Sequence, residues 1–64
     1  MQNNGVEKVI INESIHNNTY VTIFMVNGFQ LHGHILNQDD VSILIEADGK
    51  KRLLYKYNIS TIDF

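Results

Sequence analysis

From Val26 to Ile35 the chain reads VNGFQLHGHI, and this run contains the strongest structural signals in the sequence. Asn27-Gly28 predicts a tight hairpin turn, because both residues tolerate the positive φ that such a turn needs. From Leu31 to Ile35 apolar or small residues then alternate with histidines, which predicts a strand with one inward and one outward face. We place a sharp bend at Gly33, since a strand folds sharply over itself only where a Cβ is missing.

The sequence on both sides of this run is also typical of strands. YVTIFMV, from Tyr20 to Val26, is β-branched and aromatic throughout, which predicts a strand buried on both faces. Farther along, the chain has a polar turn at Asn37–Asp40 and a second hairpin signal at Asp48-Gly49. The expected strands are 20–27, 30–38, 41–47, 51–57 and 59–63. Five short strands with tight turns and no proline predict a mostly β fold, a small and strongly bent antiparallel barrel.

The segment before the first strand has two interpretations. Asn4 followed three residues later by Glu7 is typical of a helix start, and Asn17-Asn18 fits a helix exit. The apolar run Val9–Ile11 suits a strand equally well. The local pattern alone therefore leaves helix and strand equally open for residues 6–17.

The composition limits the kinds of protein this chain can be. Sixty-four residues make one domain, and a chain this short buries only ~60% of its unfolded surface. Since cysteine is absent, disulfides and thiolate metal sites are excluded, and self-association is the natural remaining source of stability. No apolar run approaches the ~18–20 residues of a membrane span, and the N-terminus lacks the features of a signal peptide. We therefore expect a cytoplasmic protein with no membrane partner.

The charge balance is unusual for a nucleic-acid binder. Five basic residues face seven acidic ones, a formal net charge of −2, whereas nucleic-acid-binding domains are usually strongly positive. Any RNA site in this chain must therefore be local, made from a small basic cluster, from aromatic stacking, or from backbone groups repeated around a ring.

Two stretches of the sequence resemble a known family. VNGFQLHGHI, followed by Asp39, resembles the first Sm motif in its bacterial form. LYKYNIST, from Leu54 to Thr61, resembles the second motif, which commonly reads YKHAIST in the Hfq family of bacterial Sm-like RNA chaperones. Two separate motifs at the correct spacing make a specific signal, and with the preceding strand the match covers about residues 19–61.

The resemblance implies a fold and an assembly. The fold is a single Sm-like (SH3-like) domain over residues 1–64, in which a short N-terminal helix precedes a five-stranded bent barrel, so the resemblance assigns residues 6–17 to a helix. The assembly is a ring, typically a homohexamer, closed by strand pairing between neighbours. Such a ring satisfies the two open edges of so small a sheet without forming fibres. Apolar residues of the last two strands, such as Leu54, Ile59 and Ile62, are then expected at subunit contacts.

The resemblance also implies an RNA-binding face far from the helix, called distal in this family. There, purine bases, adenines especially, stack on an aromatic residue and lie against apolar residues of the next subunit, which requires no net positive charge. The matching positions in this sequence are Phe24, Met25, Gly28, Phe29, Gln30, Leu31, His32, Arg52 and Thr61. Without the motif, the simpler interpretation of Phe24 and Phe29 is that both belong to the core.

The second RNA site of the family, the proximal pore, is poorly matched. Relatives bind uridines there with a glutamine near the helix start, a glutamine or lysine followed by an aromatic residue after the central turn, and a Lys-His pair. The corresponding positions here are Glu7, Asp40, Val41, Lys56 and Tyr57. Only Lys56 is kept, and two positions carry carboxylates that would repel phosphate.

Other kinds of site have weak support. His32 and His34 lie two apart on one strand face, but a metal site usually needs a third or fourth ligand, and none is evident. We therefore expect no metal, no cofactor and no enzymatic activity, and we interpret Asp39 as a structural acceptor in a turn.

Two hypotheses about function follow. The first is a ring-forming RNA chaperone that binds A-rich or purine-rich single-stranded RNA on its distal face, and so acts in post-transcriptional regulation through small RNAs. The second is a diverged Sm-fold paralogue with weak RNA binding, which acts through protein contacts or mixed rings.

Overall fold

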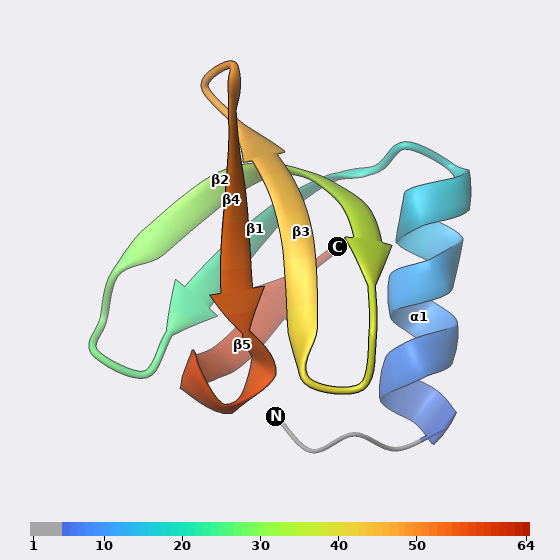
Figure 1. The fold of residues 1–64 in the computed structure, drawn as a ribbon, viewed down its shortest axis with the longest axis horizontal. Helices are drawn as coiled ribbons and strands as arrows, with labels where there is room; N and C mark the ends of the chain where they lie inside the picture. The colour runs from blue at the N-terminus through green and yellow to red at the C-terminus, as the bar shows by residue number, and fades with distance from the viewer. Residues whose placement is uncertain (1–4) are drawn as a thin grey trace.

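The computed structural model describes residues 5–64, in which one helix precedes five strands (Figure 1). In chain order the elements are α1 (Gly5–His16), β1 (Tyr20–Met25), β2 (Gln30–Gln38), β3 (Ser42–Ala47), β4 (Lys50–Tyr55), the 3-10 turn η1 (Lys56–Asn58) and β5 (Ile59–Asp63). The strands form one antiparallel sheet in the order β4-β3-β2-β1-β5. This confirms the prediction of a mostly β fold with a short N-terminal helix and a bent antiparallel barrel.

Helix α1 ends where the sequence predicts an exit. Asn18 has a φ of 52°, and its N–H donates to the carbonyl oxygen of Ile15 at 3.3 Å. The N–H of Thr19 donates to the carbonyl oxygen of Ser14 at 3.0 Å, so the last helical carbonyls are satisfied by a Schellman-type turn. The predicted start at Asn4 lies outside the described residues.

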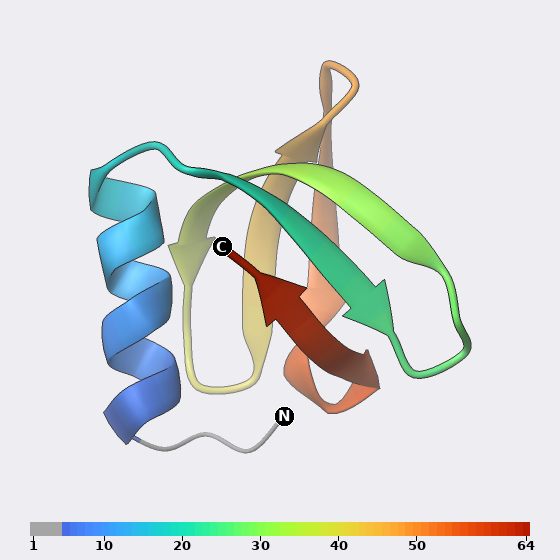
Figure 2. The ribbon, with the colours of Figure 1, turned by 180° about the vertical axis from the view of Figure 1, so that it is seen from behind.

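The core lies on the concave side of the curled sheet, and α1 stands beside one end of the barrel (Figures 1 and 2). The fully buried side chains are almost all isoleucine: Ile11, Val21, Ile23, Ile35, Ile43, Ile45 and Ile59. The prediction that the first strand is buried on both faces is wrong. Val21 and Ile23 are buried, but Tyr20 on the convex side is 63% exposed, because nothing in residues 5–64 covers that side.

Gly33 lies where β2 passes very close to the backbone of β3. A Cβ built on Gly33 would lie 2.9 Å from the carbonyl carbon of Glu46, even nearer to its oxygen, and 3.1 Å from Cα of Ala47. The pairing of β2 with β3 also shifts register between Ile35 and Asn37, and β2 curves along its length (Figure 1). The missing Cβ therefore permits the close approach that a curved strand needs, as the sequence predicts.

Both predicted hairpin turns are present, but they differ in their backbone. Asp48 and Gly49 both have positive φ, 55° and 75°, and make a two-residue connection between β3 and β4. In the turn after β1, Gly28 alone has a positive φ, of 89°. Asn27 instead accepts a hydrogen bond at its side-chain oxygen from the N–H of Phe29 at 3.0 Å. This longer turn ends β1 at Met25, earlier than the predicted boundary at residue 27.

The expected strand over 51–57 is also shorter, because β4 ends at Tyr55 and η1 follows. The chain must cross there from β4, at one edge of the sheet, to β5, at the other. Lys56 N–H donates to the carbonyl oxygen of Val41 at 2.8 Å, and Val26 N–H donates to that of Asn58 at 2.8 Å, so η1 is anchored at both ends.

One prediction about subunit contacts is wrong. Ile59 is fully buried in the core of its own chain, so it has no surface left for a neighbour. Leu54 and Ile62 are half-buried against that core. Within residues 5–64, no helix is long and apolar enough to cross a membrane.

Candidate functional site

Four of the predicted distal residues share the convex face of β1, β2 and β5, which we call the outer face. Phe24 pairs with Gln30 on one side and with Thr61 on the other, so these three side chains form a row across three strands. In the next row Thr22 pairs with His32, which therefore lies on the same side of the sheet. Phe24 is half-buried and the other three predicted residues are exposed.

The turn between β1 and β2 extends this face. Gly28 is exposed, and Phe29 keeps 62% of its surface accessible. The interpretation of Phe29 as a core residue is therefore wrong, and Phe24 is not among the buried core residues either. Both rings have surface available for stacking against a flat partner.

The remaining predicted distal residues do not join the outer face within one chain. Met25 and Leu31 point to the concave side, where they pack half-buried against the core. Arg52 lies on β4, separated from β1 by β3 and β2. The sequence motif placed all of these residues together, but only an assembly of several copies could bring Arg52 to the outer face.

His32 and His34, which the sequence placed on one strand face, each contact a different side chain. Nδ1 of His32 is hydrogen bonded to Oγ1 of Thr22 at 3.0 Å. The ring of His34 lies edge-to-face against Tyr20, with ring centroids 5.3 Å apart. Across residues 5–64, no group of three or more His, Cys, Asp or Glu side chains is arranged to hold a metal ion.

On the helix side of the barrel, the motif lysine is buried. Nζ of Lys56 donates to Oε1 of Gln38 at 3.0 Å and lies 3.9 Å from Oε2 of Glu7. The Lys56 side chain is only 3% exposed, and that of Glu7 is 7% exposed. Gln38 in turn donates from Nε2 to the carbonyl oxygen of Lys8 at 3.0 Å and to Oδ1 of Asn12 at 2.9 Å. This polar cluster therefore ties α1 to the end of β2 and to η1.

The sequence interpretation missed Gln38. By strict alternation after Leu31, position 38 belongs on the outward side of the strand. The register shift between Ile35 and Asn37 reverses this alternation, so that Gln38 pairs with the buried Ile43. The sequence does not show where a bulge reverses the alternation, so nothing in it indicates that a polar residue such as Gln38 will point inward.

The other three predicted proximal residues lie nearby but differ in their contacts. Asp40 forms an ion pair with Lys8, with Oδ1 and Nζ 2.6 Å apart. Val41 is 60% exposed in the turn before β3. Tyr57 is 70% exposed, and its ring stacks on that of Tyr55, with centroids 5.7 Å apart.

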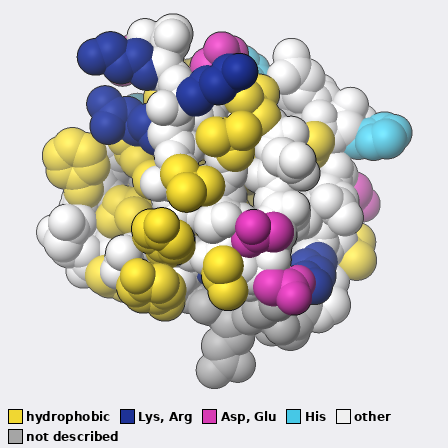
Figure 3. Space-filling model, viewed as in Figure 1, with side chains coloured by type: hydrophobic (Ala, Val, Ile, Leu, Met, Phe, Trp, Pro, Cys, Tyr) yellow, Lys and Arg dark blue, Asp and Glu magenta, His cyan; other side chains and the backbone are white. Residues whose placement is uncertain are grey.

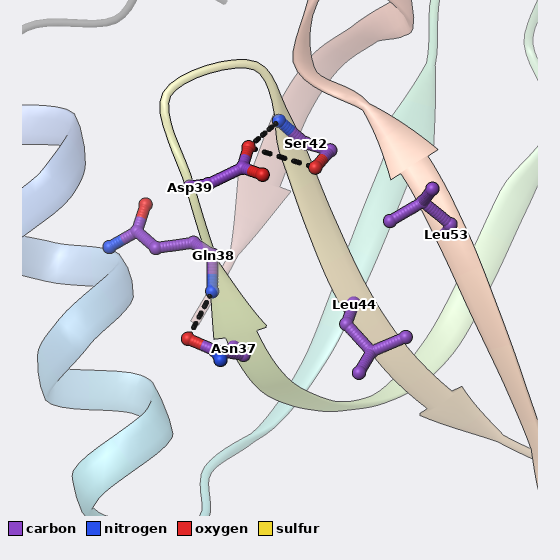
Figure 4. Close-up of a pocket in the computed structure, with 6 residues that line it drawn as sticks. All are labelled: Asn37, Gln38, Asp39, Ser42, Leu44 and Leu53. Carbon is purple, nitrogen blue, oxygen red and sulfur yellow. Dashed lines mark hydrogen bonds between the residues drawn. The ribbon is translucent and has the colours of Figure 1, made fainter.

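Asp39 stabilises the turn between β2 and β3, at the edge of a shallow hollow of about 180 Å³ (Figure 4). Its Oδ1 accepts hydrogen bonds from the N–H of Val41 at 2.9 Å, the N–H of Ser42 at 2.8 Å and the hydroxyl of Ser42 at 2.9 Å. These bonds, that of Val41 first, hold the pKa of the Asp39 carboxyl below its ordinary value of 3.8. Its predicted role as a structural turn acceptor is confirmed.

Residues 6–63 match the protein family described as "Hfq protein". The chain belongs to the Hfq family. The RNA-binding protein Hfq of Bacillus subtilis (strain 168) is 42% identical over 57 residues, which make up 89% of this chain and 78% of that protein. The RNA-binding protein Hfq of Alkaliphilus metalliredigens (strain QYMF) is 43% identical over 63 residues, 97% of this chain and 79% of the relative.

A solved structure agrees with this assignment. The 1.55 Å crystal structure of the pleiotropic translational regulator Hfq superposes with a TM-score of 0.92 at 33% sequence identity. The superposition covers 94% of this chain and all of the other. The Sm-like fold inferred from the two sequence motifs is therefore confirmed.

Proposed function

We propose that this chain binds single-stranded RNA on its outer face and acts as a ring-forming RNA chaperone with a preference for A-rich or other purine-rich segments. The observation that carries the proposal is the row of Thr61, Phe24 and Gln30, which places an aromatic ring between two hydrogen-bonding side chains on an exposed sheet face. Base stacking on such a ring contributes ~1–3 kcal/mol per base and needs no positive charge. Membership of the Hfq family supports RNA as the partner.

The ring is part of the proposal. Within residues 5–64, β4 and β5 each pair with only one strand, so both edges offer unpaired backbone groups. Pairing of β4 with β5 of the next copy, repeated around a six-fold axis, satisfies both edges. The same contact places β4, the strand that carries Arg52, beside β5 of the neighbouring copy, the strand that carries Thr61.

This function is binding, with no catalytic step and no cofactor. A ring with a purine-binding face fits a role in the cytoplasm, in which small RNAs are brought to messages for post-transcriptional regulation. Tyr57 and Lys56, on the helix side, have a minor part in it, because the Lys56 ammonium already lies against Glu7 and Gln38.

A direct titration tests the proposal. Fluorescence anisotropy at physiological salt should show that an A-rich oligonucleotide binds more tightly than a U-rich one of equal length. Light scattering on the same sample should show a closed ring and not a monomer of 7.4 kDa. Tighter binding of the U-rich oligonucleotide would contradict the assignment of the site to the outer face.

The buried contact between Lys56 and Glu7 favours a second candidate function, the diverged paralogue with weak RNA binding that acts through protein contacts or mixed rings. The same titration separates the two, since the second candidate predicts weak binding to both oligonucleotides. We favour the first candidate, because the contact removes charge only from the helix side and leaves the outer face exposed.

A further inference from the structure

The five basic residues of this chain fall into two groups, and all five lie in the described part of the chain. Two of them are on the helix side and already face a carboxylate. Lys8 is paired with Asp40 at 2.6 Å, and Lys56 lies 3.9 Å from Glu7. Neither lysine can contribute a full positive charge to an external partner, because the neighbouring carboxylate cancels most of its field.

The other three are consecutive, at Lys50, Lys51 and Arg52, and begin β4 directly after the turn. All three are exposed, and within residues 5–64 none of them forms an ion pair. Figure 3 shows Lys and Arg side chains gathered at the top of the molecule, where Figure 1 places the tip of the β3–β4 hairpin. Residues 46–52 carry three positive charges against two negative ones, in a chain whose net charge is −2.

The hairpin fixes the backbone positions of these three residues. Asp48 and Gly49 close it as a two-residue turn, and Ala47 pairs with Lys50, so the basic run starts at the first paired position. Because neighbouring strand residues point to opposite sides, Lys50 and Lys51 project from the two sides of the ribbon. A polyanion that crosses the tip therefore meets a cation on either side.

The outer face lacks the positive charge that the hairpin tip supplies. The predicted base-contacting residues on it (Phe24, Gln30, His32 and Thr61) include no Lys or Arg, and Asp63 lies in the row next to Phe24. Stacking can hold the bases of an RNA strand, but its phosphates need cations, and counterion release from them adds affinity. In the proposed ring, the β4 edge of one copy lies beside the β5 edge of the next.

We propose that Lys50 and Lys51, at the tip of the β3–β4 hairpin, form a phosphate-binding site for the backbone of RNA whose bases lie on the outer face of a neighbouring copy. This site rests on the proposed function, but it does not depend on which bases are preferred. It gives an acidic protein a way to bind RNA: bases are held by uncharged surface, and the backbone is held by a small cationic tip repeated around the ring.

The test is the salt dependence of RNA binding by the assembled ring. The variant Lys50→Gln/Lys51→Gln should make the slope of log K against log salt shallower by about 1.4 per engaged hairpin, since each lost phosphate contact on a single strand removes about 0.7. At 0.1 M salt its affinity for A-rich and U-rich oligonucleotides should fall by a similar factor, on the order of tenfold or more. Lys8→Gln is the matched control, because it removes one exposed charge on the helix side, and its slope should be that of the wild type.

The outcomes separate this proposal from the proposed function. A slope that is unchanged in the double variant, while the wild type still prefers A-rich RNA, overturns the hairpin site and leaves the outer face intact. A shallower slope in a protein without base preference supports the hairpin site and overturns the purine preference. An equal change in slope per removed charge for Lys8→Gln, about 0.7, shows that net charge alone is responsible, which also overturns the hairpin site. A wild-type ring that binds no RNA overturns both proposals.

Discussion

The outer face and the helix side of this small barrel both carry residues of the family's RNA-binding motifs, but these residues have different contacts. On the outer face, Gln30 and Thr61 are exposed beside the half-buried ring of Phe24. On the helix side, Lys56 is buried, and its ammonium is hydrogen bonded within the chain to Gln38, a half-buried residue outside the motifs. A residue that the sequence motif predicts to contact RNA can therefore have its polar group hydrogen bonded inside its own chain.

The largest expected effect comes from breaking the helix-side cluster. Lys56→Ala removes the cation from a site where Glu7 and Gln38 are also buried or half-buried, so the free energy of unfolding should fall by about 3 kcal/mol. Urea denaturation at a fixed protein concentration measures this. Lys51→Ala, at an exposed position, should change the same quantity by less than about 0.5 kcal/mol. Equal stability of the two variants would mean that the buried cluster contributes nothing to folding.

The next effect concerns the outer face. Phe24→Ala should weaken binding of A-rich RNA by ~1–3 kcal/mol per occupied site, because the stacking surface is lost. U-rich RNA should be affected less. Anisotropy titrations measure both affinities, and light scattering must show that the variant ring is still assembled. An unchanged affinity for A-rich RNA in an intact ring would remove Phe24 from the site.

A smaller effect tests whether the internal contacts of the helix side weaken RNA binding there. Glu7→Gln removes the carboxylate beside Lys56 but keeps a side chain of similar shape that can hydrogen bond. The released charge should strengthen U-rich binding and steepen its salt slope by about 0.7 for each lysine that reaches a phosphate. If U-rich affinity stays the same, the contact with Glu7 is not what limits this face.

The smallest effect is on the dependence of stability on pH. The lowered pKa of Asp39 means that its ionised form is stabilised by folding, mainly by the bonds from Val41 and Ser42. This stabilisation is complete above the ordinary value of 3.8 and is lost as the pH falls through the lowered pKa. Asp39→Asn should therefore melt at a lower temperature than the wild type at pH 7, and the two melting temperatures should converge as the pH falls below 3.8 through the lowered pKa. A constant difference across this range would show that the carboxylate charge is not involved.

Much of the fold was predictable because its signals are local. The positive φ of Gly49 and of Asn18, the close approach at Gly33 and the acceptor role of Asp39 each follow from one side chain and its immediate neighbours. The family motifs added the helix, which the local pattern left undecided. Its stability depends on contacts with distant parts of the chain, such as those of Gln38 with the backbone of Lys8.

Two of the errors have a common physical cause, which is the curvature of the sheet. A register shift reverses the inward and outward positions beyond it, so Gln38 points to the core side although simple alternation places it outside. Curvature also leaves the convex side of β1 uncovered, so Tyr20 is exposed despite an apolar strand around it. For the candidate site, the sequence grouped Arg52 with Phe24, but the strand order keeps them apart within one chain.

The crossing at Gly33 has a genetic consequence. The atoms that leave no room for a side chain there are the carbonyl group of Glu46 and Cα of Ala47, which belong to the main chain. Every amino acid has these atoms, so no replacement at either position makes space for a Cβ. A search for suppressors of Gly33→Ala should therefore find none at residues 46 and 47, and any second-site rescue must come from changes that move the two strands apart or that stabilise the barrel elsewhere.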